Sequence, residues 1–359
     1  MKKIALIDYD MSVRGGVEQV TASLASALAD FYEVHLLSLC QTGTLAYELD
    51  KRVVYTPMLD KELRLREMQR TLRPRLTAYF KEHGIDTAIV QGNYPGFIVS
   101  PVRLGSRVKL IFCDHGALMN QWDRRDIVVI RLISSLLCHK TVTLTQQSRS
   151  DYQKKFHLSG RKVCCIPNWV DLGNGRSEAF DESSRRIVSA GRFGKEKGFD
   201  LLVEAFAPVA KKHPDWSLDL FGDGEMMPAV RELVAKYGLE QQVNLLGMRR
   251  DLAQRYRDYS MYVLPSYREG MPLVLLEAKA NRLPIISFDI MTGPREIVRD
   301  GVDGILVKPY DLKALGDAMC TLIENDALRC KLAKRSHENL DKFSKQTILQ
   351  QWRDLIEGK

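Results

Sequence analysis

The sequence predicts an α/β protein built from two doubly wound domains in tandem, and three observations support this fold class. Short apolar runs alternate with segments of helical period along the whole chain. Most of these runs are apolar throughout, as in parallel strands that are covered by helices on both faces. The chain has 359 residues, which is more than one hydrophobic core usually organises.

The first half begins with a strand, a glycine pair and a helix. The pair is Gly15-Gly16, and the helix runs from about Val17 to Asp30. The strands expected in this half are Lys3–Tyr9, Glu33–Leu39, Asp86–Gln91, Val108–Asp114 and Lys140–Thr145.

The alternation pauses at Ile166–Arg186, where Pro, Asn, Gly and Ser are dense, as in a linker. Beyond it we expect helices at about Phe199–Lys212 and Met227–Tyr237, and an amphipathic helix at about Ser344–Ile356. The predicted divisions are residues 1–168, 169–343 and 344–359. The strands expected in the second half are Arg186–Gly191, Trp216–Gly222, Gln242–Gly247, Ser260–Ser266 and Pro284–Asp289.

Composition narrows the class of protein and its compartment. Hydrophobic content of 45% and charged content of 27% are ordinary for a globular chain. The seven cysteines form no C-x-x-C pair, so we expect reduced core residues in a cytoplasmic protein instead of a metal cage or a disulfide framework. The start of the chain resembles no secretory signal, and the longest apolar run, Ile127–Cys138, is interrupted by Arg131.

The net charge of +8 favours an anionic partner. Nucleic acid, phospholipid and a phosphorylated ligand all satisfy it, but nucleic acid is not expected, because no aromatic and basic signature accompanies the charge. The segment Lys61–Leu76 contains five arginines. We expect this segment and Trp122–Leu137 to contact an anionic membrane surface. A solvated basic helix is the alternative for the arginine-rich segment. The five are Arg64, Arg66, Arg70, Arg73 and Arg75.

Two loops at strand ends suit a phosphate. Gly15-Gly16 lets the backbone approach a ligand just before a helix, although glycine pairs also make plain turns. The stretch Gly191–Asp200 presents Arg192 and Lys197 ahead of a helix, where cations oppose the helix dipole and an anion between them relieves the conflict. Solvated charges are the alternative.

The stretch Ser266–Asp289 places one glutamate before a helix and another inside it. Pro272 favours the first helical turn, so the free N–H groups near Leu273 and Val274 can hold phosphate oxygens. Glu269 lies ahead of the helix and Glu277 about one and a half turns in, among apolar residues that are expected to be buried. A carboxylate accepts well from vicinal hydroxyls, so the pair suits a sugar and a ribose.

Glu269 and Glu277 also form an E-x7-E signature, and with it the chain resembles the retaining glycosyltransferases of family four, which have the GT-B fold of two Rossmann-like domains facing a central cleft. The resemblance covers nearly the whole chain. The other matching blocks are Gly15–Glu18, Ile166–Asp171, Gly191–Asp200, Phe221–Glu225 and Asp300–Val307.

The resemblance implies roles for these residues. Arg192 and Lys197 would neutralise the diphosphate of a nucleotide sugar, Glu277 would take the ribose hydroxyls, and Glu269 would take the transferred sugar. From the first domain, which would carry the acceptor, Gly16 would approach the diphosphate and His115 the sugar; a lone histidine can also be structural. The backbone contacts to the donor would come from Gly270, Met271, Pro272, Leu273 and Val274. The last helix would cross back to the first domain.

The resemblance further implies retention at the anomeric carbon, no metal and no cofactor besides the nucleotide-sugar donor. The catalytic residues would be His115, Glu269, Arg192 and Lys197. Many relatives carry two glycines where this chain has Thr292-Gly293-Pro294, a variant that resembles bacterial enzymes of capsule, O-antigen and other surface polysaccharides. The donor is expected to be UDP carrying Gal, GalNAc, GlcNAc or Glc, and the acceptor a polyprenyl-diphosphate-linked glycan, reached at the inner face of the cell membrane.

Two rival functions remain open at this point. Another GT-B enzyme, such as a sugar-nucleotide epimerase or a sugar-phosphate synthase, would share the nucleotide pocket. A catalytically silent nucleotide-sugar-binding protein would keep the same fold, although the intact set of Arg192, Lys197, Glu269 and Glu277 speaks against it.

Overall fold

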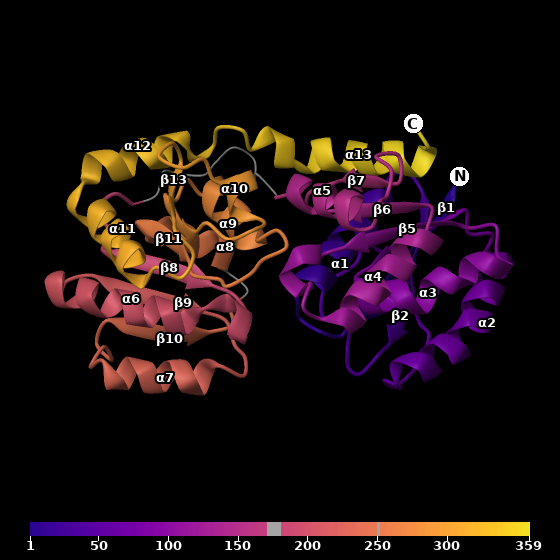
Figure 1. Ribbon diagram of the computed structural model, residues 1–359, viewed down its shortest axis with the longest axis horizontal. Helices are drawn as coiled ribbons and strands as arrows, with labels where there is room; N and C mark the ends of the chain where they lie inside the picture. The colour runs from indigo at the N-terminus through magenta and orange to yellow at the C-terminus, as the bar shows by residue number, and fades with distance from the viewer. Residues whose placement is uncertain (171–180, 250–251) are drawn as a thin grey trace. The chain divides into compact units, whose positions relative to one another are not determined.

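The computed structural model describes residues 1–170, 181–249 and 252–359. It divides into two compact units (Figure 1): unit 1 comprises residues 1–168 and 348–359, and unit 2 comprises residues 169–347. Each unit contains one parallel sheet with helices on both of its faces. Two Rossmann-like units of this kind confirm the predicted fold class.

The sheet of unit 1 has seven strands in the order β3-β2-β1-β4-β5-β6-β7. Every pairing is parallel, and in the middle of the sheet Ala5 lies opposite His35 on one side and Ala88 on the other. The strands are β1 Lys3–Asp10, β2 Glu33–Cys40, β3 Val54–Pro57, β4 Thr87–Gln91, β5 Lys109–Asp114, β6 Lys140–Thr143 and β7 Val163–Cys165.

The helices of unit 1 bury apolar stripes against this sheet. In α2, Met68, Leu72, Leu76 and Phe80 recur every four residues and are all buried. The helices are α1 Gly16–Leu28, α2 Leu65–His83, α3 Asn93–Val99, α4 Arg125–Leu137, α5 Gln146–Lys155 and α13 Lys345–Glu357, of which α13 belongs to unit 1 from residue 348 on. The 3₁₀ turns are η1 Ser100–Gly105 and η2 Leu118–Gln121.

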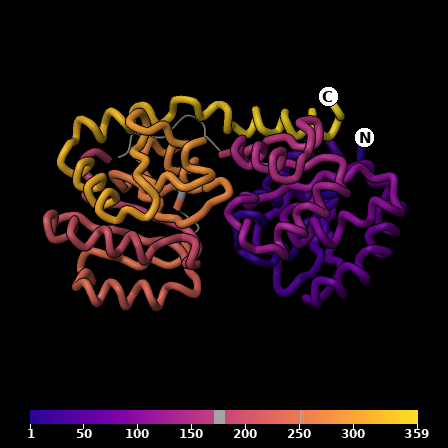
Figure 2. Tube along the Cα trace, in the orientation of Figure 1, coloured from indigo at the N-terminus to yellow at the C-terminus, as the bar shows by residue number. Residues whose placement is uncertain are grey.

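The last helix, α13, packs on unit 1. It buries Trp352, and Lys109 Nζ donates to the carbonyl of Leu355 at 2.6 Å. Arg353 stacks over the ring of Phe31 at 3.9 Å. Both ends of the chain therefore lie on unit 1 (Figure 2).

The sheet of unit 2 has six described strands in the order β10-β9-β8-β11-β12-β13, again all parallel. The strands are β8 Arg186–Ala190, β9 Ser217–Phe221, β10 Val243–Gly247, β11 Met261–Leu264, β12 Ile285–Phe288 and β13 Gly304–Val307. The helices are α6 Phe199–Lys212, α7 Met227–Lys236, α8 Leu252–Arg255, α9 Leu273–Ala280, α10 Pro294–Ile297, α11 Leu312–Glu324 and α12 Asp326–Ser336, with the 3₁₀ turns η3 Lys195–Lys197, η4 Tyr256–Asp258 and η5 Asp341–Phe343.

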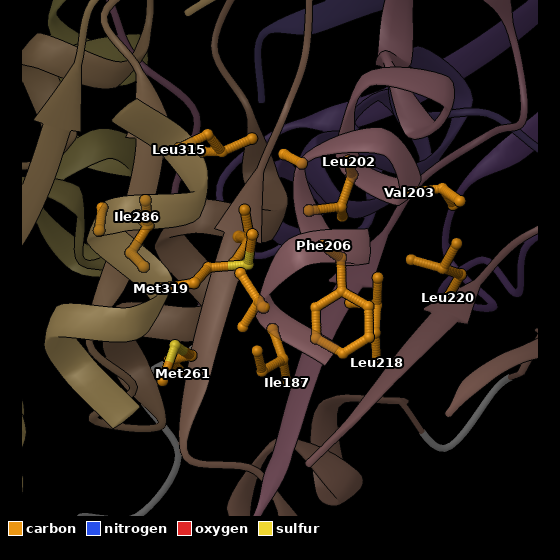
Figure 3. Close-up of a cluster of buried hydrophobic side chains, with 14 of the residues drawn as sticks. Ile187, Leu202, Val203, Phe206, Leu218, Leu220, Met261, Ile286, Leu315 and Met319 are labelled. Atoms are coloured by element: carbon orange, nitrogen blue, oxygen red, sulfur yellow. The ribbon is translucent and has the colours of Figure 1, made fainter. Parts of the chain in front are cut away.

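The core of unit 2 joins α6 and α11 to one face of its sheet (Figure 3). Phe206 of α6 and Met319 of α11 are fully buried among strand residues such as Ile187 and Leu218. Close packing of this kind fixes the strands firmly, so the loops at their carboxyl ends start from rigid positions.

Three short strands were not predicted from the sequence: β3, β7 and β13. Strand β3 lies at a sheet edge and ends in Pro57, which lacks the N–H that an interior strand needs. Strand β7 has three residues, too few for a period to be visible. Residues 171–180 of the expected linker lie outside the described residues.

Candidate functional site

A carboxylate network lies where β11 ends in unit 2. Oε1 of Glu269 accepts a hydrogen bond from Ser266 Oγ at 2.7 Å and pairs with Lys197 Nζ at 2.7 Å. The Glu269 side chain is 9% exposed and that of Lys197 is 23% exposed. A carboxylate this deep requires such partners, because an unpaired buried charge is costly. The structure thus brings together two of the residues singled out from sequence.

The backbone at Gly198 brings Lys197 to this place. Gly198 has φ +66°, and a Cβ there would lie 2.2 Å from the carbonyl oxygen of Pro265. Only glycine tolerates both the conformation and the contact, so the β8–α6 loop rests directly on the end of β11. The aliphatic part of Lys197 in turn passes over Gly191, within 3.6 Å of where a Cβ would stand.

Arg192 lies on the same loop but has a different partner. Its Nη2 donates to Glu196 Oε1 at 3.0 Å, and its side chain is 72% exposed. Such an exposed pair contributes little to stability, so a bound phosphate can compete with Glu196 for this guanidinium. The carbonyl of Glu196 also accepts from the Tyr267 N–H at 2.9 Å, which ties the loop to the segment after β11.

Helix α9 carries the second glutamate. Pro272 is the residue just before the helix, one position earlier than expected, and Leu273 begins it. Leu273 and Val274 are half-buried and Met271 is buried. The first N–H groups of a helix lack partners within it, so this end can receive an anion.

Glu277 is half-buried, and Tyr256 lies beside it. The hydroxyl of the fully buried Tyr256 donates to Glu277 Oε2 at 3.3 Å. Burial raises the pKa of Glu277, and the Tyr256 hydrogen bond opposes that shift. Nothing in the sequence pattern indicated Tyr256, which lies 21 residues earlier in the chain.

The far half of α9 is anchored by buried charges. Lys279 Nζ lies 2.9 Å from Asp303 Oδ2 and 2.9 Å from the carbonyl oxygen of Ile297. Arg299 adds two further donors to Asp303, its main-chain N–H at 2.8 Å and its Nε at 2.7 Å. Asp303 belongs to the sequence block Asp300–Val307, so this block fixes the helix that carries Glu277.

A second loop reaches Glu269 from β12. The Thr292 hydroxyl donates to the main-chain oxygen of Glu269 at 2.6 Å, and Thr292 is 3% exposed. Neither Thr292 nor Ser266 was expected to act on Glu269. Both stand in stretches that sequence analysis singled out, but their contacts exist only in the folded chain.

His115 lies in unit 1, directly after β5. One ring nitrogen, Nε2, lies 2.6 Å from Gln91 Oε1 at the end of β4. Burial lowers the pKa of His115 to about 4, so the ring is neutral near pH 7. Beside it, the buried Asp114 pairs with Arg131 at 3.0 Å; Arg131, which interrupts an apolar run in the sequence, is therefore an internal residue.

Gly16 begins α1 in unit 1, and Gly15 is the residue before that helix. The Tyr47 hydroxyl donates to the Gly15 carbonyl at 3.0 Å, which fixes the turn. The contacts of Gly16 and His115 with a donor stay predictions.

One group of potential metal ligands occurs among the described residues, away from the residues above. It comprises His213, Cys320 and Glu324, whose ligand atoms lie within 4.8 Å of one another. Glu324 already accepts from Lys212 and, at 3.0 Å, lies beside His213 Nε2. A cation would have to displace the Lys212 ammonium, so the group is better read as a surface ion pair.

Two family models together match residues 14–339 of the chain. Residues 14–174 match Glycosyltransferase Family 4, and residues 174–339 match Glycosyl transferases group 1. The chain belongs to glycosyltransferase family four. For this glycosyltransferase, the carboxylate network and α9 lie inside the second match, and Gly16 and His115 inside the first.

Relatives of similar length accompany this family-four enzyme. A glycosyltransferase of Haemophilus influenzae is 26% identical, over 99% of this chain and all of its own length. The amylovoran biosynthesis glycosyltransferase AmsD of Erwinia amylovora is 27% identical, with the same coverage of 99% and 100%. A Campylobacter jejuni enzyme that adds N-acetylgalactosamine to an undecaprenol-diphosphate-linked saccharide is 26% identical over 97% of each chain.

Solved structures share the fold of this glycosyltransferase. HepE of Anabaena, solved with UDP and glucose, superposes with a TM-score of 0.85 at 17% identity over 100% of both chains. A sucrose-phosphate synthase of Thermosynechococcus elongatus gives a TM-score of 0.83 at 20% identity over 100% of both chains. Among the described residues, no helix combines the length and the apolar character needed to cross a bilayer.

Proposed function

We propose that this glycosyltransferase moves a hexose or N-acetylhexosamine from a UDP-sugar to a hydroxyl of a lipid-linked surface glycan, with retention at the anomeric carbon. The observation that carries the proposal is the contact of Lys197 with Glu269 just ahead of α9. It sets a cation for phosphate and a carboxylate for sugar side by side. Glu277 follows within the same helix as an acceptor for the ribose hydroxyls.

The same residues account for departure of the diphosphate. As the bond between the anomeric carbon and the phosphate oxygen breaks, negative charge develops on that oxygen. Lys197 and the first N–H groups of α9 are fixed donors that stabilise this charge. The exposed Arg192 guanidinium adds to them when the phosphate takes it from Glu196. Electrostatic stabilisation of the leaving group is thus the main catalytic contribution that we assign to unit 2.

Retention follows from attack on the same face that the phosphate leaves. The acceptor hydroxyl forms the new glycosidic bond, and its proton passes to the departing phosphate oxygen, so atoms and charge balance without a protein nucleophile. Glu269 holds the sugar hydroxyls, and the neutral His115 ring offers a hydrogen bond instead of a charge. No step of this reaction uses a metal or a further cofactor.

UDP is the proposed nucleotide, since the fold relative HepE was solved with UDP and glucose. The proposed acceptor is lipid-linked, as in the Campylobacter jejuni relative, whose acceptor carries undecaprenol diphosphate. Such an acceptor places the enzyme at the cytoplasmic face of the cell membrane. A smaller acceptor is the alternative, because a sucrose-phosphate synthase has the same fold.

One face of unit 1 suits contact with an anionic bilayer. Helices α2 and α4 both pack on the turn η1; α2 carries exposed arginines, and η1 and α4 carry exposed apolar side chains. Leu104 is 71% exposed, and Val129 and Leu136 are about half exposed. Apolar side chains beside cations match lipid tails beside anionic headgroups.

Vesicle flotation tests the membrane part of the proposal. The enzyme should float with phosphatidylglycerol vesicles and not with phosphatidylcholine vesicles. Leu136→Glu should reduce flotation, whereas Met248→Glu, which changes an equally exposed methionine of unit 2, should not. Equal flotation of the two variants would show that this face of unit 1 does not contact the vesicles.

Turnover tests the reaction itself. The enzyme is incubated with UDP-Gal, UDP-GalNAc, UDP-GlcNAc and UDP-Glc, with and without a polyprenyl-diphosphate-linked saccharide, and UDP release is followed. We expect one sugar to be preferred and the lipid-linked acceptor to accelerate release. Release to a small acceptor alone would support a synthase, and binding without release would support a silent binding protein.

A further inference from the structure

The segment that carries Glu269 belongs to no helix or strand. Between the end of β11 at Leu264 and the start of α9 at Leu273, the chain follows bends. No ladder of backbone hydrogen bonds therefore fixes the angle at which the Glu269 main chain presents its carboxylate. Other contacts have to do so, because a functional carboxylate requires a rigid setting.

Thr292 supplies such a contact from the neighbouring loop. Its hydroxyl donates to the Glu269 carbonyl at 2.6 Å, and both residues are buried. The bond crosses 23 residues of sequence and joins the loop after β12 to the loop after β11. Thr292 thus binds the main chain of Glu269, whereas Ser266 and Lys197 bind its carboxylate.

Gly293 allows the loop after β12 to contact the segment that carries Glu269. It has φ +101°, which side chains rarely tolerate, and a Cβ there would lie 2.8 Å from Pro272 Cδ and 3.3 Å from the Gly270 carbonyl oxygen. The glycine thus allows the β12 loop to lie directly on the residues between Glu269 and α9. Thr292 and Gly293 act on both ends of this short segment.

We infer that Thr292 is a positioning residue, which sets the orientation of the Glu269 carboxylate toward the transferred sugar. The inference rests on the proposed function, since it assigns Glu269 to the sugar. It also gives a physical role to the stretch Thr292-Gly293-Pro294, in which this chain departs from the glycine pair of many relatives. A glycine at position 292 has no hydroxyl to donate.

The role of Thr292 separates sugar recognition from nucleotide recognition. UDP lacks the sugar and is linked to Glu269 only through Lys197, so its affinity should depend less on the angle of Glu269 than the affinity of UDP-sugar does. Displacing a reacting group by about 1 Å can reduce a rate by about 10²-fold. Loss of the Thr292 hydroxyl should therefore lower kcat and the preference for UDP-sugar over UDP.

The test compares Thr292→Val with Thr292→Ser. Valine keeps the branched shape and removes the donor, and serine restores the donor. We expect Thr292→Val to lose about 10²-fold in kcat, to lose little affinity for UDP, and to bind UDP-sugar less well relative to UDP. Thr292→Ser should recover most of the kcat. It should also recover most of the ratio of UDP-sugar affinity to UDP affinity, which we call the binding ratio.

Ser287→Ala is the matched control. Ser287 is also buried, and its hydroxyl donates to a main-chain carbonyl, that of Phe288, at 2.9 Å on the strand before the loop. Its removal should lower thermal stability and leave the binding ratio unchanged. Gly293→Ala is the second variant, in case Thr292→Val folds poorly, and should reproduce the change in binding ratio.

Two results would overturn the inference: wild-type kcat and binding ratio in Thr292→Val, or an equal loss of UDP and UDP-sugar affinity in that variant. The binding ratio is measured by calorimetry without turnover. Failure of the wild type to release UDP from any sugar would instead reject the proposed function, and the binding ratio of Thr292→Val would still decide the role of Thr292.

Discussion

The ammonium of Lys197 lies 2.7 Å from Oε1 of Glu269, across 72 residues of sequence. This contact joins the loop after β8 to the loop after β11, at the carboxyl ends of two adjacent strands. Open parallel sheets bind ligands at such ends. The pair therefore couples the group proposed for the phosphates to the group proposed for the sugar.

Replacement of Lys197 by alanine should reduce kcat/KM by about 10²- to 10³-fold, the usual effect of losing one fixed donor to a developing anion. Lys195, which is exposed in the same 3₁₀ turn, is the matched control. Lys195→Ala should retain turnover in a UDP-release assay. Equal activity of the two variants would reject the role of Lys197.

UDP binding should weaken as the pH falls through the raised pKa of Glu277. Burial raises that pKa, and the ribose hydroxyls donate to the ionised carboxylate, so protonation removes the acceptor. Calorimetric titration with UDP across a pH series measures the effect. Glu277→Gln should bind more weakly at neutral pH and lose this pH dependence.

The same shift affects stability in the opposite direction. Since the folded-state pKa of Glu277 is raised, its contribution to stability is complete below the unfolded pKa and is lost as the pH rises through the folded pKa. Glu277→Gln should therefore raise the Tm at neutral pH more than at acidic pH. An unchanged Tm difference across the series would contradict the burial of this carboxyl.

Loss of the Tyr256 hydroxyl should move the acidic limb of UDP binding to higher pH. The Tyr256 hydrogen bond lowers the pKa of Glu277, so Tyr256→Phe raises it further. Tyr259→Phe is the control, since the Tyr259 hydroxyl donates to Asp219 at 2.8 Å instead. The prediction fails if both variants give the wild-type profile.

Breaking the Lys279–Asp303 pair should destabilise unit 2. Both side chains are buried, and loss of the only partner of a buried charge costs about 3–5 kcal/mol. Asp303 keeps Arg299 as a partner, so the cost of removing Lys279 should lie below that range. Lys279→Met should therefore lower the midpoint of urea unfolding. Lys313→Met, which breaks the exposed pair with Asp317, should have little effect.

The sequence predicted the fold better than it predicted the contacts of the site. Apolar runs and glycine-containing loops marked the central strands of both sheets, because the pattern of a buried parallel strand is local. The edge strand β3 lacks that pattern, since half of it faces solvent. Arg131 interrupted an apolar run and yet lies inside, because its partner Asp114 stands on another element.

Lys197, Glu269 and Glu277 were found because the loops and the helix that carry them have recognisable sequences. Their partners Ser266, Tyr256 and Thr292 were not, because a hydroxyl in a loop is compatible with many settings. Only the folded chain shows which carbonyl or carboxylate each hydroxyl meets.

A crystal structure of the enzyme with UDP tests the central claim most directly. We expect the diphosphate to contact Lys197 and the first N–H groups of α9, and the ribose hydroxyls to donate to the Glu277 carboxylate. A nucleotide bound elsewhere, or one whose phosphates avoid Lys197, would contradict it.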